Sequence, residues 1–194
     1  VTELCDLLEA DEALRRAAGQ RLETARRRST EKKDLLQNTI DKNRDNSPIA
    51  IPVLMDEIRK ALPQDAIVVD DCWSSSPMLR SILDLKEENT YFRPRNGGSI
   101  GSGLPCTAGV KLANPSRPVV GIVGDGSAAW CMQSLWTSAK YRIPATFLVV
   151  NNATYRQVKT VRKIILGDYP LNEKHVGMEL DDPIINFSAL SESM

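Results

Sequence analysis

The chain has 194 residues, and its 25 Lys and Arg balance its 25 Asp and Glu, so that its formal net charge is zero. This length suits one core of ordinary size with an appendage. The balanced charge gives no reason to expect nucleic acid or an anionic membrane as a partner. No apolar run approaches the ~20 residues that span a bilayer, and the first residues lack the layout of a secretory signal. The four cysteines are too scattered for a zinc site or a disulfide framework, so we expect a reducing, cytoplasmic location.

Residues 1–47 are highly charged and contain a single glycine, Gly19. Their leucines recur at helical spacing, which predicts one or two helices with a solvated basic face. A patch that binds anions or nucleic acid is the alternative, and the interleaved acidic residues disfavour it. The polar stretch around residues 41–48 is a plausible boundary, so we expect a helical linker over 1–47 and a separate domain over 48–194.

From Pro48 the pattern alternates between helices and strands, which predicts an α/β fold with a doubly wound, mainly parallel sheet and helices on both faces. Such a fold binds ligands at the carboxyl ends of its strands. Beyond Tyr155 the chain is less regular, and residues 164–183 are expected to form a loop region. The predicted elements are, in chain order, helix 51–62, strand 66–69, helix 77–85, helix 101–112, strand 118–123, helix 127–141, strand 146–151 and the start of a helix at 186.

Two polar motifs follow neighbouring predicted strands. Gly124-Asp125-Gly126-Ser127 ends one apolar run, and Asn151-Asn152-Ala153-Thr154 ends the next. A right-handed strand–helix–strand crossover places both strand ends on the same edge of a parallel sheet, so Asp125 and Asn152 should be neighbours. One carboxylate, one amide oxygen and a backbone carbonyl suit Mg²⁺ (or Ca²⁺), which takes its remaining oxygens from phosphate and water. The glycines allow a phosphate to approach the backbone, and the following helix directs its positive end there.

Each of these residues also has a purely structural interpretation. Asp125 and Ser127 could cap a helix, Asn152 could be a turn residue, and the Ser74-Ser75-Ser76 run could form a turn and a cap. The pairing of Asp125 with Asn152 favours metal binding, and the serine run should lie beside the same loop. His175 is the only histidine, in a predicted loop, so neither a Ser/His/Asp triad nor a histidine metal cluster is present. The chain also lacks a P-loop and the GxGxxG order of dinucleotide-binding proteins.

The two motifs together resemble the diphosphate-binding motif of thiamine diphosphate (ThDP) enzymes, in which GDG is followed about two dozen residues later by NN. The segment Asn96 to Pro105 is similar to the family's sequence just upstream. The segments GDGS, LWTSAKYRIP and NNATY are most similar to the benzoylformate decarboxylase and acetolactate synthase branch. The resemblance extends from Pro48 to the C-terminus and implies the ThDP-binding fold, with ThDP and Mg²⁺ (or Ca²⁺) as cofactors.

The resemblance also implies roles for individual residues. The metal ligands would be Asp125, Asn152 and the backbone carbonyl of Thr154. Ile100 would support the cofactor in its bent shape, and the carbonyl of Gly98 would accept a hydrogen bond from the aminopyrimidine. The full set of implied cofactor-binding residues is Ser74, Ser75, Gly98, Ile100, Gly124, Asp125, Gly126, Ser127, Asn152, Thr154 and Tyr155.

On this basis the chain is expected to be the diphosphate- and Mg²⁺-binding part of a ThDP-dependent 2-oxo acid decarboxylase or carboligase. In the family, the activating Glu lies in a pyrimidine-binding domain, which residues 1–47 are too short to hold, so no catalytic residue is assigned here. We expect the chain alone to be inactive, its first 47 residues to end a middle domain, and its C-terminus to be truncated. The parent would be a homodimer or homotetramer, with the pyrimidine-binding domain from the same or a neighbouring subunit. The alternatives are a non-catalytic diphosphate-binding or assembly module and an α/β protein that binds a Mg²⁺-nucleotide.

Overall fold

The structure is a computed structural model that describes residues 2–85, 87–94, 96–167 and 170–194. It divides into two compact units, Val1–Glu57 and Ile58–Met194. The boundary between them falls within helix α3 (Ile51–Ala61). This helix confirms the one predicted over 51–62. None of the helices in the described part of the chain is both long and apolar enough to cross a membrane.

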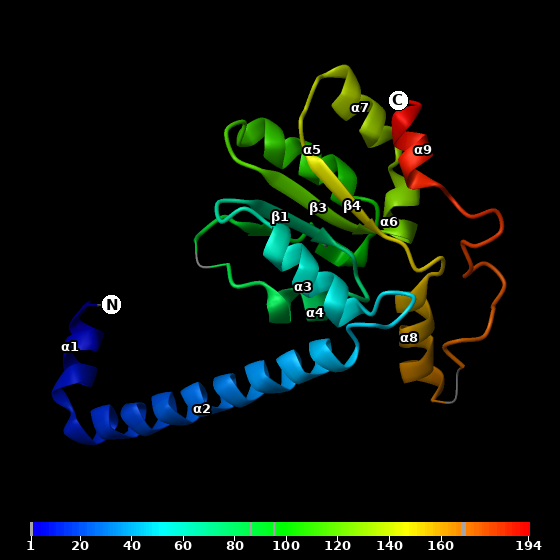
Figure 1. Cartoon of the computed structure of the whole chain (residues 1–194). Helices are drawn as coiled ribbons and strands as arrows, with labels where there is room; N and C mark the ends of the chain where they lie inside the picture. Colours follow the sequence, from blue (N-terminus) through cyan, green and yellow to red (C-terminus); the bar gives the residue numbers. More distant parts are fainter. Residues whose placement is uncertain (1, 86, 95, 168–169) are drawn as a thin grey trace. The chain divides into compact units, whose positions relative to one another are not determined.

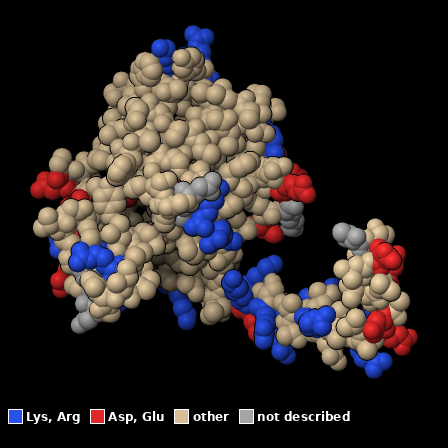
Figure 2. Space-filling view, turned by 180° about the vertical axis from the view of Figure 1, so that it is seen from behind, with Lys and Arg blue, Asp and Glu red and all other residues tan. Residues whose placement is uncertain are grey.

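The first unit contains the two helices expected near the N-terminus, α1 (Thr2–Ala10) and α2 (Glu12–Lys42). They are separated at Asp11, whose side chain accepts a hydrogen bond from the backbone N–H of Leu14 at 3.0 Å and so caps α2. Acidic side chains gather on the first 14 residues, and basic ones along residues 15–33 (Figure 2). Ile40 is the one buried residue of α2, and the apolar side chains of Leu22 and Leu35 are 53% and 67% exposed.

The second unit is built on a parallel sheet with the strand order β2-β1-β3-β4 (Figure 1). The strand order reverses between β1 and β3, so right-handed crossovers place α4 on one face of the sheet and α5, α6 and α7 on the other. The predicted doubly wound α/β fold is therefore confirmed. The elements are β1 (Ile67–Asp71), α4 (Ser76–Ile82), β2 (Tyr91–Phe92), the short helix η1 (Asn96–Gly98), α5 (Gly103–Ala113), β3 (Val119–Gly124), α6 (Asp125–Trp130), α7 (Gln133–Lys140), β4 (Thr146–Val150), α8 (Arg156–Leu166) and α9 (Phe187–Glu192).

Helix α5 packs closely against β1 and β3 because two glycines leave room for it. A Cβ added at Gly121 of β3 would come within 2.3 Å of Thr107 Oγ1 on α5. A Cβ at Gly103, the first residue of α5, would lie 2.6 Å from the Cβ of Asp71. This approach brings the start of α5 directly beside the carboxyl end of β1.

Two predicted segments differ from the structure. The expected helix 127–141 is divided into α6 and α7, with non-helical backbone at Cys131. The division lies where the loop at Gly101 packs on it, since a Cβ at Gly101 would meet Trp130 Cβ at 2.9 Å. The chain after Tyr155, expected to be irregular, forms the eleven-residue helix α8. Its apolar residues recur three and four positions apart, but the interleaved Lys and Arg obscure that pattern.

Candidate functional site

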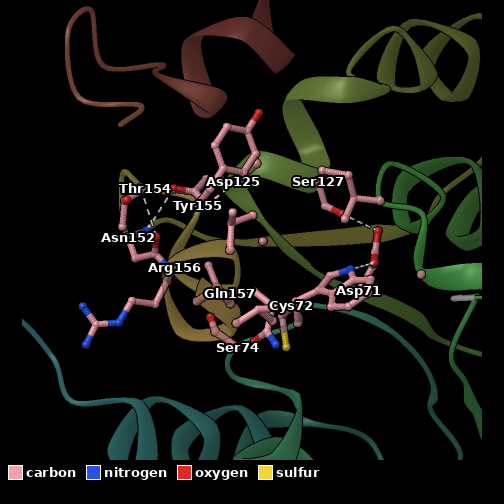
Figure 3. A pocket seen from close by; sticks show the side chains of 18 of the residues that line it. Asp71, Cys72, Ser74, Asp125, Ser127, Asn152, Thr154, Tyr155, Arg156 and Gln157 are labelled. Carbon is pink, nitrogen blue, oxygen red and sulfur yellow. Dashed lines mark hydrogen bonds between the residues drawn. The ribbon is translucent and has the colours of Figure 1, made fainter. Parts of the chain in front are cut away.

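A cavity of about 310 Å³ lies at the carboxyl ends of β1, β3 and β4, and residues of the second unit line it (Figure 3). Its position is the one at which doubly wound sheets bind ligands, next to the reversal of strand order between β1 and β3. The volume is at the lower end of the range for small-molecule sites. The loops after all three strands contribute to its wall, as the fold prediction required.

On one side of the cavity, the carboxylate of Asp71 joins three segments of the chain (Figure 3). Asp71 is 0% exposed and accepts hydrogen bonds from the Trp73 indole at 3.1 Å, the Gly103 N–H at 3.0 Å and the Ser127 hydroxyl at 2.7 Å. The Ser127 oxygen in turn accepts the Gly101 N–H at 3.1 Å. This network fixes the loops after β1 and β3 and the start of α5 relative to one another. Asp71 is not among the site residues predicted from the sequence.

On the other side, Asp125 and Asn152 meet as the crossover rule predicts (Figure 3). The Asp125 carboxylate accepts the N–H of Gly126 at 2.8 Å and the N–H of Asn152 at 3.1 Å. The side-chain oxygen of Asn152 accepts the N–H of Thr154 at 3.1 Å. Burial raises the pKa of Asp125, and hydrogen bonds from the surrounding backbone N–H groups oppose that shift. A cation beside this desolvated carboxylate would favour its ionised form.

The oxygen atoms of Asp125, Asn152 and Thr154 suit a Mg²⁺ ion only if most of the ion's ligands come from elsewhere. Within the described residues, no group of three or more His, Cys, Asp and Glu side chains could hold a metal ion. Asp125 could supply one carboxylate to such an ion, and Asn152 and Thr154 could add an amide and a carbonyl oxygen. Such a set suits Mg²⁺, which keeps waters and substrate phosphate oxygens in its shell. A diphosphate is the kind of ligand that completes it.

The remaining predicted residues divide into those that line the cavity and one that does not. Gly98 and Ile100 come from the loop before α5, and Gly98 has a φ of +81°. Ser75 is 3% exposed next to the start of α4, does not line the cavity, and donates its N–H to the Cys72 carbonyl. The predicted residues that line the cavity are Ser74, Gly98, Ile100, Gly124, Asp125, Gly126, Ser127, Asn152, Thr154 and Tyr155.

Helix α8 adds cavity residues that the sequence analysis missed because it did not predict the helix. Val158 and Val161 give this wall an apolar surface, and Gln157 and Arg162 lie beside them. The guanidinium of Arg156 points away from the cavity (Figure 3), since it donates to the Leu171 carbonyl and the Asn172 side chain. His175 is not among the lining residues, and a hydrogen bond joins its ring to the Pro170 carbonyl.

Comparison with known proteins identifies the family. The sequence model described as "Thiamine pyrophosphate enzyme, C-terminal TPP binding domain" matches residues 74–194. The chain belongs to this family. The match confirms the predicted ThDP-binding fold and ThDP as the cofactor of this domain. The residues around the cavity fit that cofactor, because glycine backbone, short hydroxyl side chains and oxygen donors for a metal lie together at the strand ends.

Individual relatives are considerably longer than this chain. Benzoylformate decarboxylase of Pseudomonas aeruginosa is 34% identical over 148 residues, which cover 76% of this chain and 26% of the relative. Sulfoacetaldehyde acetyltransferase of Alcaligenes xylosoxydans xylosoxydans is 30% identical over 138 residues, covering 71% of this chain and 22% of the relative. The solved structure of a ThDP-dependent 4-hydroxybenzoylformate decarboxylase of Rhodococcus jostii RHA1 superposes with a TM-score of 0.67 at 34% identity, covering 75% of this chain and 26% of that one. This chain thus spans about a quarter of the length of these relatives.

Proposed function

We propose that this ThDP-binding domain holds the diphosphate and a Mg²⁺ (or Ca²⁺) ion for an enzyme that decarboxylates or condenses a 2-oxo acid. The observation that carries the proposal is the meeting of Asp125 with Asn152 and Thr154 at the ends of β3 and β4. Relatives named as benzoylformate decarboxylase and acetolactate synthase support the reaction class.

In this proposal each part of the cavity has a separate task. The side chains of Asp125 and Asn152 and the carbonyl of Thr154 hold the metal. The backbone around Gly126 and Ser127 and the hydroxyl group of Ser74 lie where they can surround the diphosphate. The Ser127 hydroxyl, which donates to Asp71, would hold this loop in place beside it. When bound, ThDP supplies an electron sink for cleavage of the bond next to the substrate's carbonyl carbon. Ile100 and the carbonyl of Gly98 are assigned to the shape and hydrogen bonding of the cofactor.

The proposal includes partners outside residues 1–194. The activating Glu is expected from a pyrimidine-binding domain of the same or a neighbouring subunit, within a homodimer or homotetramer. The domain's own contribution is then to bind and orient the cofactor. A cytoplasmic location is consistent with the four cysteines, all of them free thiols in the described part of the chain.

Binding measurements with Asp125→Ala test the proposal directly. We expect the intact enzyme to bind ThDP in a Mg²⁺-dependent manner by isothermal titration calorimetry, and Asp125→Ala in that enzyme to lose the dependence. Asp34→Ala, on exposed helix α2, is the control and should bind as the wild type does. Unchanged Mg²⁺-dependent binding in Asp125→Ala would contradict the assigned role. Tighter binding of Mg²⁺-ATP than of Mg²⁺-ThDP would instead favour the nucleotide-binding alternative.

A further inference from the structure

The loop that carries Asn152 and Thr154 pairs with a distant segment, which we call the strap (residues 178–180). The two run antiparallel, with a bridge between Thr154 and Glu179. Backbone hydrogen bonds on either side of Thr154 hold the pairing, and a side-chain bond adds to it. These three bonds are Tyr155 N–H to Met178 O at 2.8 Å, Leu180 N–H to Ala153 O at 2.8 Å and Thr154 Oγ1 to Met178 O at 2.8 Å.

An ion pair joins the strap to helix α8, which begins directly after this loop. Lys159 Nζ lies 2.6 Å from Glu179 Oε1, and the Lys159 side chain is 3% exposed. The same ammonium donates to the Glu173 carbonyl at 2.9 Å, and Glu179 Oε1 accepts the N–H of His175 at 2.9 Å. Polar backbone groups of residues 173–175, the segment before the strap, therefore contact both partners of the ion pair.

In this ion pair Lys159 is buried and the Glu179 side chain is 19% exposed. Such a pair is a poor device for stability, because the cost of removing charge from water offsets much of the attraction. Its better-attested use is to fix one arrangement of the elements that it joins. The neighbouring pair of Lys174 and Asp181 provides the contrast. The Lys174 side chain is 75% exposed, and exposed pairs contribute little to stability. Only the buried pair joins α8 to the residue opposite Thr154.

We propose that Lys159 and Glu179 are positioning residues whose ion pair holds the strap against the loop, and so keeps Asn152 and Thr154 in place beside Asp125 at the proposed metal site. The metal part of this inference rests on the proposed function. The geometric part does not, because it concerns hydrogen bonds within the chain. Loss of the pair should loosen Thr154 while the sheet keeps its structure, since β3 and β4 pair independently of the strap.

Amide hydrogen exchange by NMR on the full chain tests the geometric part. We expect the N–H groups of Tyr155 and Leu180 to exchange at least about tenfold faster in Lys159→Met and Glu179→Gln, as the local opening free energy falls. The amides of β3 should exchange as slowly as in the wild type. That result would show that the variants remain folded. Lys159→Arg should restore wild-type exchange, and the control Lys174→Met should not change it. Wild-type exchange at Tyr155 and Leu180 in both variants would overturn the inference.

Titration with Mg²⁺ and ThDP tests the metal part on the same variants of the intact enzyme. Residues that orient metal ligands typically change metal affinity about 10–100-fold, so Glu179→Gln should require at least about tenfold more Mg²⁺ for the same ThDP binding. Lys174→Met should match the wild type. Equal Mg²⁺ requirements in wild type and Glu179→Gln would overturn the positioning role and leave the proposed function standing. An intact wild-type enzyme that binds ThDP with no dependence on Mg²⁺ would overturn the proposed function and the metal part of the inference with it.

Discussion

Substitution of Gly126 by Ala would test how closely the diphosphate loop is packed. Gly126 is the second residue of α6, and a Cβ added there would lie 2.6 Å from Tyr155 Cε1 and 2.9 Å from Cδ1. Carbon atoms in contact are ordinarily about 3.5–4.0 Å apart, so the tyrosine ring would have to retreat by about 1 Å. Tyr155 also donates its N–H to Met178, next to the loop that carries the proposed metal ligands.

Two opposing terms set the expected change in stability. Alanine is favoured over glycine within a helix by about 1 kcal/mol. Overpacking of a well-filled site costs about 1–3 kcal/mol. Gly126→Ala should therefore lower the free energy of unfolding by up to about 2 kcal/mol. Gly109→Ala in α5 is the matched control, because a Cβ there meets nothing within 4 Å. That variant should be stabilised by at most about 1 kcal/mol.

Urea unfolding of the chain, followed by circular dichroism, would give both free energies. Calorimetric titration of the same variants of the intact enzyme would give ThDP affinity in the presence of Mg²⁺. We expect only Gly126→Ala to bind ThDP more weakly, because the displaced ring alters the cavity wall. If Gly126→Ala were as stabilising as Gly109→Ala and bound ThDP normally, the packing argument would be refuted.

Substitutions at three other positions address other parts of the site. Ile100→Gly in the intact enzyme should lower kcat more than it lowers ThDP affinity, since a bent cofactor serves the reacting geometry while the diphosphate supplies most anchoring; wild-type kcat would exclude that role. Asp71→Ala should lower the free energy of unfolding in urea by about 3 kcal/mol, because the buried groups that donate hydrogen bonds to Asp71 lose their acceptor. Asp71→Asn keeps an acceptor oxygen and should lower that free energy by less. Equal losses would contradict this account. The hydrogen bond from Lys159 lowers the pKa of Glu179 from 4.5 to about 2. The resulting stabilisation is complete above pH 4.5 and is lost as the pH falls toward 2, so Glu179→Gln should flatten the pH dependence of urea midpoints in that window. An unchanged acid profile would argue against the ion pair.

The sequence alone was sufficient to predict the fold class and the meeting of Asp125 with Asn152. Both depend on rules that act locally or through chain topology. Continuous apolar runs mark buried parallel strands, and the fixed hand of the crossover puts consecutive strand ends on one edge. Two residues 27 positions apart thus become neighbours whatever the surrounding side chains are. The glycines beside Asp125 also follow from a local requirement, because a phosphate can approach the backbone closely only where no side chain intervenes.

Tertiary structure decided which polar groups hold that site in place. Asp71 and Ser127 are 56 positions apart, and each also has a plausible local role in its own loop or helix, so nothing in the sequence selects their hydrogen bond. The same is true of Lys159 and Glu179, which meet only because α8 forms and the strap folds back along it. Short polar side chains can satisfy nearby backbone or distant partners at similar free energy. Their partners are therefore set by the packing of the elements that carry them, and that packing is a property of the whole fold.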